Sequence, residues 1–103
     1  MRVVWMPLAK DAVRNTAKYI RWKFGKQYRD NFMQKVREAN LIISDNPYAG
    51  KLEPLLEDDP DKYRSFVVAR LNKMVYRIVG DHIEVDDFWD CRQDPEVLTD
   101  RLK

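Results

Sequence analysis

The stretch YRSFVVARLNKMVYRIVGDHIEVDDFWDCRQDP, residues 63–95, decides the fold of this 103-residue chain. It contains three runs rich in Val, Ile, Phe and Tyr, which favour strands. Gly80-Asp81 separates the second run from the third and predicts a two-residue hairpin turn. Leu71-Asn72 separates the first run from the second and predicts another tight turn. The stretch therefore predicts a three-stranded antiparallel meander.

Side chains alternate along a strand, so this register assigns every residue to one of two faces. The predicted core face collects Tyr63, Ser65, Val67, Ala69, Met74, Tyr76, Ile78, Ile83 and Val85. The opposite face is predicted to collect basic residues and a few apolar ones: Arg64, Phe66, Val68, Arg70, Lys73, Val75, Arg77, Val79, His82, Glu84 and Asp86. Arg77 and Glu84 fall opposite each other and are expected to pair. The cations of the meander are thus predicted on one exposed surface.

In the first half of the chain, the pattern of apolar residues changes from that of a strand to that of a helix. Arg2–Met6 is a short β-branched and aromatic run ended by Pro7, which predicts an edge strand. An apolar residue then recurs every three or four positions, which predicts a helix from about Leu8 to Phe24 and a second one ending near Ser44. Gly25 lies between them, so the two helices are expected to form an antiparallel hairpin.

The remaining segment, residues 46–62, has three prolines and five acidic residues and is interpreted as a long loop. A helix pair on a mainly antiparallel sheet gives an α+β domain of two layers. At this length, residues 1–103 form one domain.

Composition narrows the class of protein. Apolar residues make up 45% of the chain and charged residues 35%, which is typical of a small globular domain. The single cysteine, Cys91, cannot form an internal disulfide, and no Cys/His cluster suggests zinc. We therefore expect no metal and no cofactor. The sequence has no long apolar stretch for a signal peptide or a membrane span, so the expected location is the cytoplasm.

The net charge of +2 conceals alternating blocks of sign. Residues 1–40 carry ten Lys/Arg against three Asp/Glu, and residues 63–79 carry four against none. Acidic residues dominate in residues 45–62 and 80–103. Two explanations remain open: solvated faces whose signs cancel in space, or a basic patch that attracts a polyanion.

The order strand, helix, helix and three strands resembles the RelE/ParE superfamily of toxins from bacterial type II toxin–antitoxin systems. The resemblance covers nearly the whole chain, and Tyr63-Arg64, residues 75–78 and residues 89–95 are its most specific parts. It implies a toxin of the plasmid-stabilisation type, which arrests growth and is neutralised by a cognate antitoxin encoded beside it.

The resemblance implies two activities on this fold. RelE-like members cut messenger RNA on the ribosome, and Arg64, Lys73 and Arg92 match basic site residues of these nucleases. ParE-like members inhibit DNA gyrase without a known catalytic constellation. Lys73 replaces a planar arginine, and Leu98 occupies the position expected for the nuclease tyrosine. These departures favour ParE-like inhibition of DNA gyrase or another protein, with a ribosome-dependent mRNA endonuclease as the alternative.

Arg70, Arg77, Trp89 and Phe66 are the expected partner-binding residues, because a surface that mixes rings with arginine suits an amphipathic segment or nucleic acid. Trp22 lies off the apolar stripe of the first helix and is a further candidate contact. Both modes of action require that Arg64, Lys73 and Arg92 be displayed together on the exposed side of the sheet.

Overall fold

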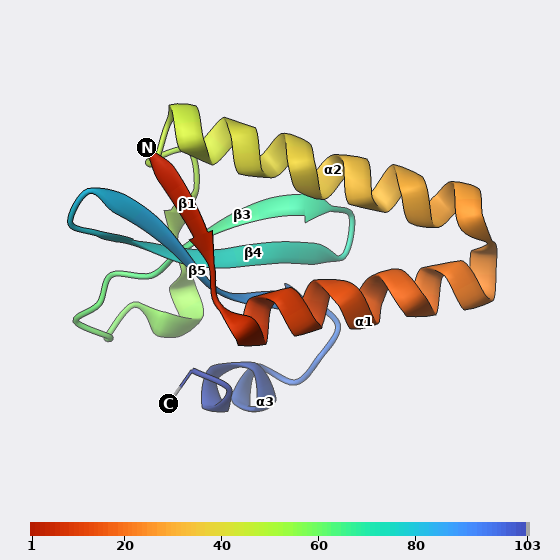
Figure 1. Ribbon diagram of the computed structural model, residues 1–103. Coiled ribbons are helices and arrows are strands. Elements are labelled where there is room, and N and C mark those ends of the chain that lie inside the picture. The colour runs from red at the N-terminus through yellow and green to blue at the C-terminus, as the bar shows by residue number, and fades with distance from the viewer. Residues whose placement is uncertain (103) are drawn as a thin grey trace.

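One mixed sheet organises the protein, and helical segments lie on both of its faces (Figure 1). The computed structural model describes residues 1–102. In chain order the elements are β1 (Arg2–Trp5), α1 (Pro7–Phe24), α2 (Lys26–Asp45), β2 (Lys51–Leu52), the 3-10 turn η1 (Pro54–Leu56), β3 (Arg64–Ala69), β4 (Asn72–Val79), β5 (His82–Asp90) and α3 (Pro95–Asp100). The strand order across the sheet is β1-β5-β4-β3-β2. The predicted α+β class is confirmed.

β1 lies at one edge of the sheet, as its sequence predicts. It pairs with β5 in parallel, with Val3 opposite Ile83, while the other neighbouring strands run antiparallel. The backbone N–H of Met6 continues this pairing by donating to the carbonyl of Val85 at 3.0 Å. The N-terminal strand therefore joins the meander and makes the sheet mixed.

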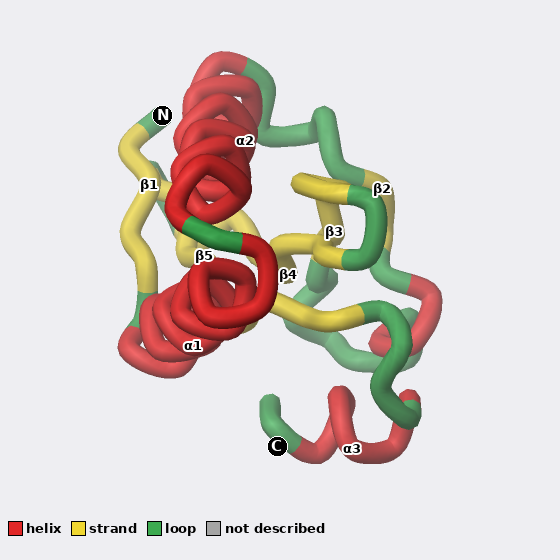
Figure 2. Tube along the Cα trace, turned by 90° about the vertical axis from the view of Figure 1, so that its right-hand side faces the viewer, coloured by secondary structure: helices red, strands yellow, loops and turns green. Residues whose placement is uncertain are grey.

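The two long helices form the predicted antiparallel hairpin, and Figure 2 shows them side by side over one face of the sheet. Gly25 joins them with a φ of +96°, a conformation that residues with a Cβ rarely adopt. Beyond the β3–β4 turn, the hairpin extends past the sheet (Figure 1). The core beneath the helices comprises Ala9, Val13, Phe32, Val36, Ala39, Ile43, Met74, Tyr76, Ile83, Val85 and Phe88.

The β4–β5 hairpin has the predicted turn. Val79 pairs with His82 across Gly80-Asp81, and Arg77 lies opposite Glu84. The register shifts beyond Tyr76, which pairs with Val85. Asp86 is the extra residue in this bulge, because Val75 then pairs with Asp87.

The predicted register of the β3–β4 hairpin is wrong. Ala69 pairs with Asn72, so the turn residues are Arg70 and Leu71 rather than Leu71 and Asn72. An irregularity between Val67 and Ala69 then shifts the pairing by one residue. A shift of one residue turns every following side chain to the other face.

The faces assigned to the first part of β3 are consequently exchanged. Phe66 lies opposite Met74 and packs with Val68 against the helix-covered core, although both were expected on the exposed side. Arg64 lies opposite Tyr76, also on the helix face. Ser65 and Val67, expected in the core, share the opposite face with Val75 and Lys73.

The second face of the sheet carries a cover that the sequence does not predict. Leu98 of α3 packs with Tyr63, Val75 and Trp89 in a second buried cluster, and Leu56 of η1 packs against the same cluster. The segment interpreted as one long loop, residues 46–62, thus contains β2 and η1. This cover removes the open basic surface on which the sequence-based hypothesis depended.

Candidate functional site

Lys73 lies on the second face, within a buried ion pair. Its Nζ contacts Glu53 Oε1 at 2.6 Å and Oε2 at 2.8 Å, and Ser65 Oγ donates to the same carboxylate at 2.8 Å. Glu53 has no exposed surface, and the Lys73 ammonium also lies 5.3 Å from the centre of the Trp89 ring. The Lys73 ammonium is therefore the counter-ion of the buried Glu53 carboxylate, which belongs to the long connection between α2 and β3.

Arg64 belongs to the other face. Its Nη1 donates to the carbonyl oxygen of Gly50 at 2.8 Å, and its guanidinium lies over the Tyr48 ring. The Tyr76 hydroxyl donates to Pro47 O at 2.7 Å and accepts from Gly50 N at 2.9 Å. A Cβ on Gly50 would lie 2.6 Å from this hydroxyl, so the segment approaches the sheet as closely as glycine permits. Arg64 and Tyr76 thus hold the start of the connection against the sheet.

Arg77 forms ion pairs with three carboxylates on the second face. The pairs join it to Glu84 at 3.0 Å, Asp61 at 3.2 Å and Asp86 at 3.2 Å, and the first is the pair predicted from the sequence. Burial, followed by the neighbouring Glu84, raises the pKa of Asp86 from 3.8 to about 7. The pKa of Glu84 is lowered, by its hydrogen bond with Asp86 and then by that with Arg77. Glu84 and Asp86 thus pair with the same guanidinium, but their pKa values are shifted in opposite directions.

Trp89 is buried under α3. Its Nε1 donates to Asp87 Oδ2 at 2.9 Å, and Arg101 donates to both oxygens of Asp87, from Nε at 2.7 Å and from Nη2 at 2.9 Å. Neither Trp89 nor Asp87 has exposed surface. Of the four predicted partner-binding residues, Trp89 is buried, Phe66 is partly buried against the helix-covered core and Arg77 is ion-paired. Arg70 is exposed at the β3–β4 turn.

Arg92 and Arg70 line the same groove, which lies beneath the overhanging end of the helix hairpin. The groove has a volume of about 1220 Å³ and is bounded by α1, α2, the β3–β4 turn and the residues after β5. Arg92 is mostly exposed, and its guanidinium donates to both oxygens of Asp90, from Nε at 3.0 Å and from Nη2 at 2.7 Å. This hydrogen bonding lowers the pKa of the Asp90 carboxyl. We call this space the overhang groove.

Aromatic and basic side chains of the helix hairpin complete the overhang groove. From the end of the hairpin, the groove is lined by Tyr19, Lys23, Phe24 and Tyr28, together with the aliphatic Ile20. Lys35 of α2 adds a further cation, while Asp11 and Glu38 are acidic residues of the lining. The groove can therefore hold an elongated partner through mixed aromatic and ionic contacts. The sequence predicts a contact at Trp22 in this region but not at the neighbouring rings.

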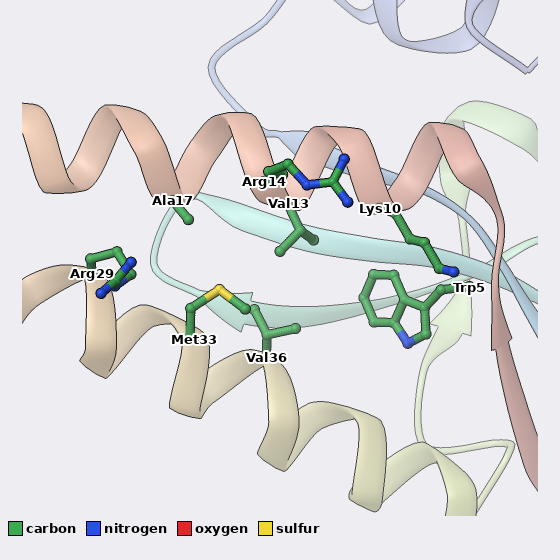
Figure 3. Close-up of a pocket in the computed structure, with 8 residues that line it drawn as sticks. All are labelled: Trp5, Lys10, Val13, Arg14, Ala17, Arg29, Met33 and Val36. Atoms are coloured by element: carbon green, nitrogen blue, oxygen red, sulfur yellow. The ribbon is translucent and has the colours of Figure 1, made fainter.

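A second concavity lies between the two helices and β1, as Figure 3 shows. Its volume is about 420 Å³. Its apolar lining comes from Trp5, Val13, Ala17, Met33 and Val36, and Lys10, Arg14 and Arg29 also border it. Trp5 is fixed by the hydrogen bond from its Nε1 to Asn40 Oδ1 at 2.8 Å. This interhelical pocket can accept an apolar side chain that has acidic neighbours.

The described residues offer few groups for metal binding or for catalysis by histidine or cysteine. Among residues 1–102, no three His, Cys, Asp or Glu side chains are grouped closely enough to hold a metal ion. His82 lies at the β4–β5 turn with Asp81 Oδ1 3.4 Å from its Nδ1, and Cys91 is exposed and unpaired. Within the same part of the chain, no helix combines the length and apolar character needed to cross a bilayer.

The comparisons with known proteins agree with this architecture. The family described as the ParE toxin of the parDE type II toxin–antitoxin system matches residues 3–95. No curated protein sequence matches significantly.

Two solved structures share the fold. One, described as the chromosomal ParDE toxin–antitoxin system from P. aeruginosa, aligns with a TM-score of 0.67 and 16% identity, over 82% of this chain and 89% of that chain. The other, a YoeB/ParE toxin from Agrobacterium tumefaciens, aligns with a TM-score of 0.56 and 24% identity, over 82% of this chain and 92% of that chain.

Proposed function

Because the chain belongs to the ParE toxin family of type II toxin–antitoxin systems, we propose that it arrests growth by binding a protein target rather than by cutting RNA. DNA gyrase is the first target to test. A cognate antitoxin neutralises the toxin, and both proteins act in the cytoplasm. The sequence-based hypothesis placed this activity on an exposed basic sheet face. The surfaces proposed for it here are the overhang groove and the interhelical pocket.

The separation of Arg64 from Lys73 is the observation that carries the proposal. Cleavage of a phosphodiester through the neighbouring 2′-OH needs cations that converge on one phosphate and a group that transfers protons. Arg64 lies on the helix face, whereas Lys73 lies on the second face and neutralises Glu53. The two cations therefore cannot meet one scissile phosphate in this conformation, and inhibition by binding needs no such convergence.

The overhang groove is the proposed surface for the protein target. Arginine and aromatic side chains are enriched at protein interfaces, and this groove offers Arg70, Arg92 and Tyr19 together. The carboxylate of Asp90 holds the Arg92 guanidinium in a fixed orientation. A target segment would replace the solvent around these side chains.

The interhelical pocket is the proposed anchor site for the antitoxin. Its apolar lining can take one large aliphatic or aromatic side chain, and the cations at its border suit a segment with acidic residues. The substitution Met33→Asp should abolish neutralisation by the antitoxin in co-expressing cells. Leu41→Asp, a matched change at an exposed position of the same helix, should leave neutralisation intact. Equal loss in both variants would contradict this placement.

Two assays with the purified protein test the mode of action. In the first, DNA gyrase supercoils a relaxed plasmid, and we expect the protein to inhibit it. In the second, ribosomes carry a defined message, which we expect to remain intact. Arg92→Ala should weaken the inhibition and Lys51→Ala, an exposed cation of β2, should not. Cleavage of the message at a fixed codon position would overturn the proposal in favour of the endonuclease.

A further inference from the structure

The end of the helix hairpin has a composition that packing does not explain. Nine of the twelve residues from Lys18 to Arg29 are either cations or aromatic, and none is acidic. The rings are Tyr19, Trp22, Phe24 and Tyr28, and the cations are Lys18, Arg21, Lys23, Lys26 and Arg29. Trp22 is 81% exposed, Tyr28 62% and Phe24 53%. We call these residues the hairpin tip.

The four rings form two pairs with a cation between them. The centroids of Tyr19 and Trp22 lie 6.2 Å apart, and those of Phe24 and Tyr28 lie 5.8 Å apart. The Lys23 ammonium lies 5.7 Å from the Tyr19 centroid and 5.6 Å from that of Phe24. Within the pairs the rings are tilted to each other by 44° and 46°, so the arrangement is two exposed aromatic pairs with one positive charge between them.

The cations of the hairpin tip are largely available to a ligand. Lys26 and Arg29 both approach Asp30, at 3.9 and 2.7 Å. Lys18, Arg21 and Lys23 form no ion pair within residues 1–102. Lys23 donates to the Tyr19 hydroxyl at 3.2 Å but, like the other two, has no carboxylate partner. Three such cations beside exposed rings favour a ligand that repeats negative charge and flat surface along its length.

We propose that the hairpin tip binds single-stranded nucleic acid. Each ring pair offers a base a surface for stacking, and the Lys23 ammonium between them is placed to contact the phosphate that links two stacked bases. Proteins that hold single strands without sequence preference combine these elements, a cationic track and aromatic platforms. This function goes beyond the proposed inhibition of a protein target and does not depend on it.

The nature of the exposed apolar groups favours this ligand over a membrane. The hairpin tip exposes rings, whereas its aliphatic residue, Ile20, packs against the helix-covered core. Burial in acyl chains favours aliphatic side chains as well as rings, while stacking uses rings only.

Fluorescence anisotropy of labelled oligothymidylate and oligouridylate tests the proposal with the full-length protein. Trp22→Ala should weaken binding by roughly 5- to 150-fold, because it removes one stacking platform. Tyr48→Ala, which removes an exposed ring elsewhere, should have no effect. The slope of log affinity against log salt should fall by about 0.7 for each phosphate that Arg21→Gln or Lys23→Gln leaves without its cation. Lys51→Gln is the matched charge control and should keep the slope.

Competing ligands and a folding check decide the outcome. Circular dichroism should show that the tip variants stay folded, since the changed side chains are exposed. Preference for one oligonucleotide would distinguish DNA from RNA as the source of the strand. The proposal is overturned if neither oligonucleotide binds, if Trp22→Ala binds as tightly as the parent, or if polyglutamate or vesicles containing phosphatidylserine bind equally well.

Discussion

The helix-covered face of the sheet is packed by apolar side chains, whereas the face under α3 buries two carboxylates beside its apolar cluster. The partners of these carboxylates come from distant parts of the chain: Lys73 lies twenty positions from Glu53, and Arg101 lies fourteen from Asp87. A buried charge without a partner is strongly unfavourable. Apolar packing therefore covers one face of the sheet, whereas the cover of the other face combines an apolar cluster with buried ion pairs.

Removal of Lys73 should have the largest effect on stability. Lys73→Met leaves Glu53 buried without its counter-ion and should lower the free energy of unfolding by about 3–5 kcal/mol. Urea denaturation followed by circular dichroism measures this loss. Glu53→Gln added to Lys73→Met should recover part of it, since the amide carries no charge. A loss below about 1 kcal/mol would show that water reaches the carboxylate and would remove the contrast between the two faces.

Truncation of an apolar side chain on the helix face should cost somewhat less. Ile43→Ala removes a fully buried side chain of α2 and should lower the free energy of unfolding by roughly 2–5 kcal/mol. Because the two residues lie on opposite faces without a shared partner, Ile43→Ala and Lys73→Met should be additive in urea denaturation. A coupling above about 0.5 kcal/mol would contradict the independence of the faces.

The pH dependence of stability should reveal the Asp86 carboxyl of the second face. Its folded pKa of about 7 exceeds the ordinary value of 3.8, so the folded state binds more protons between these values. Its contribution to stability is complete below pH 4 and is lost as the pH rises toward 7, by up to about 1.4 kcal/mol per pH unit. The lowered pKa of Glu84 acts in the opposite direction, since its contribution is lost on acidification.

The matched variant for this prediction is Asp86→Asn. It should flatten the fall in thermal denaturation midpoint between pH 4 and pH 7, while Asp58→Asn, a change at an exposed carboxylate of the connection between α2 and β3, should not. An unchanged profile for Asp86→Asn would assign the titration to another group.

Arg92→Ala should have the smallest effect on stability. Its guanidinium is exposed and pairs with Asp90 at the surface, so urea denaturation should show no measurable change. Growth arrest on induction of the toxin should nevertheless weaken, because Arg92 lies in the overhang groove. Full toxicity in this variant would exclude Arg92 from the target surface.

The sequence predicts the helix-covered face well for a physical reason. The apolar stripe of each helix and the Gly80-Asp81 turn are local signals, and both are confirmed. The predicted register of β3 is wrong because the irregularity between Val67 and Ala69 leaves no clear signal in composition. This one-residue shift moves Phe66 into the core and separates Arg64 from Lys73.

The second face is harder to predict because its contacts are long-range. Nothing in the residues around Glu53 indicates that its partner is Lys73. One signal exists for α3: Asp94 followed by Pro95 is a typical helix start, and Asp94 accepts a hydrogen bond from the backbone N–H of Glu96 at 2.9 Å. The apolar Leu98 and Leu102 then indicate a buried side for this segment.

The pairing of β1 with β5 has a consequence for synthesis on the ribosome. The first strand of the chain finds its neighbour only when residues 82–85 have left the exit tunnel, although the helix hairpin can associate earlier. The α3 cover, with Arg101, emerges later still. A truncated nascent chain that ends before β5 thus lacks the partner of β1, and the complete sheet forms only after β5 has been synthesised.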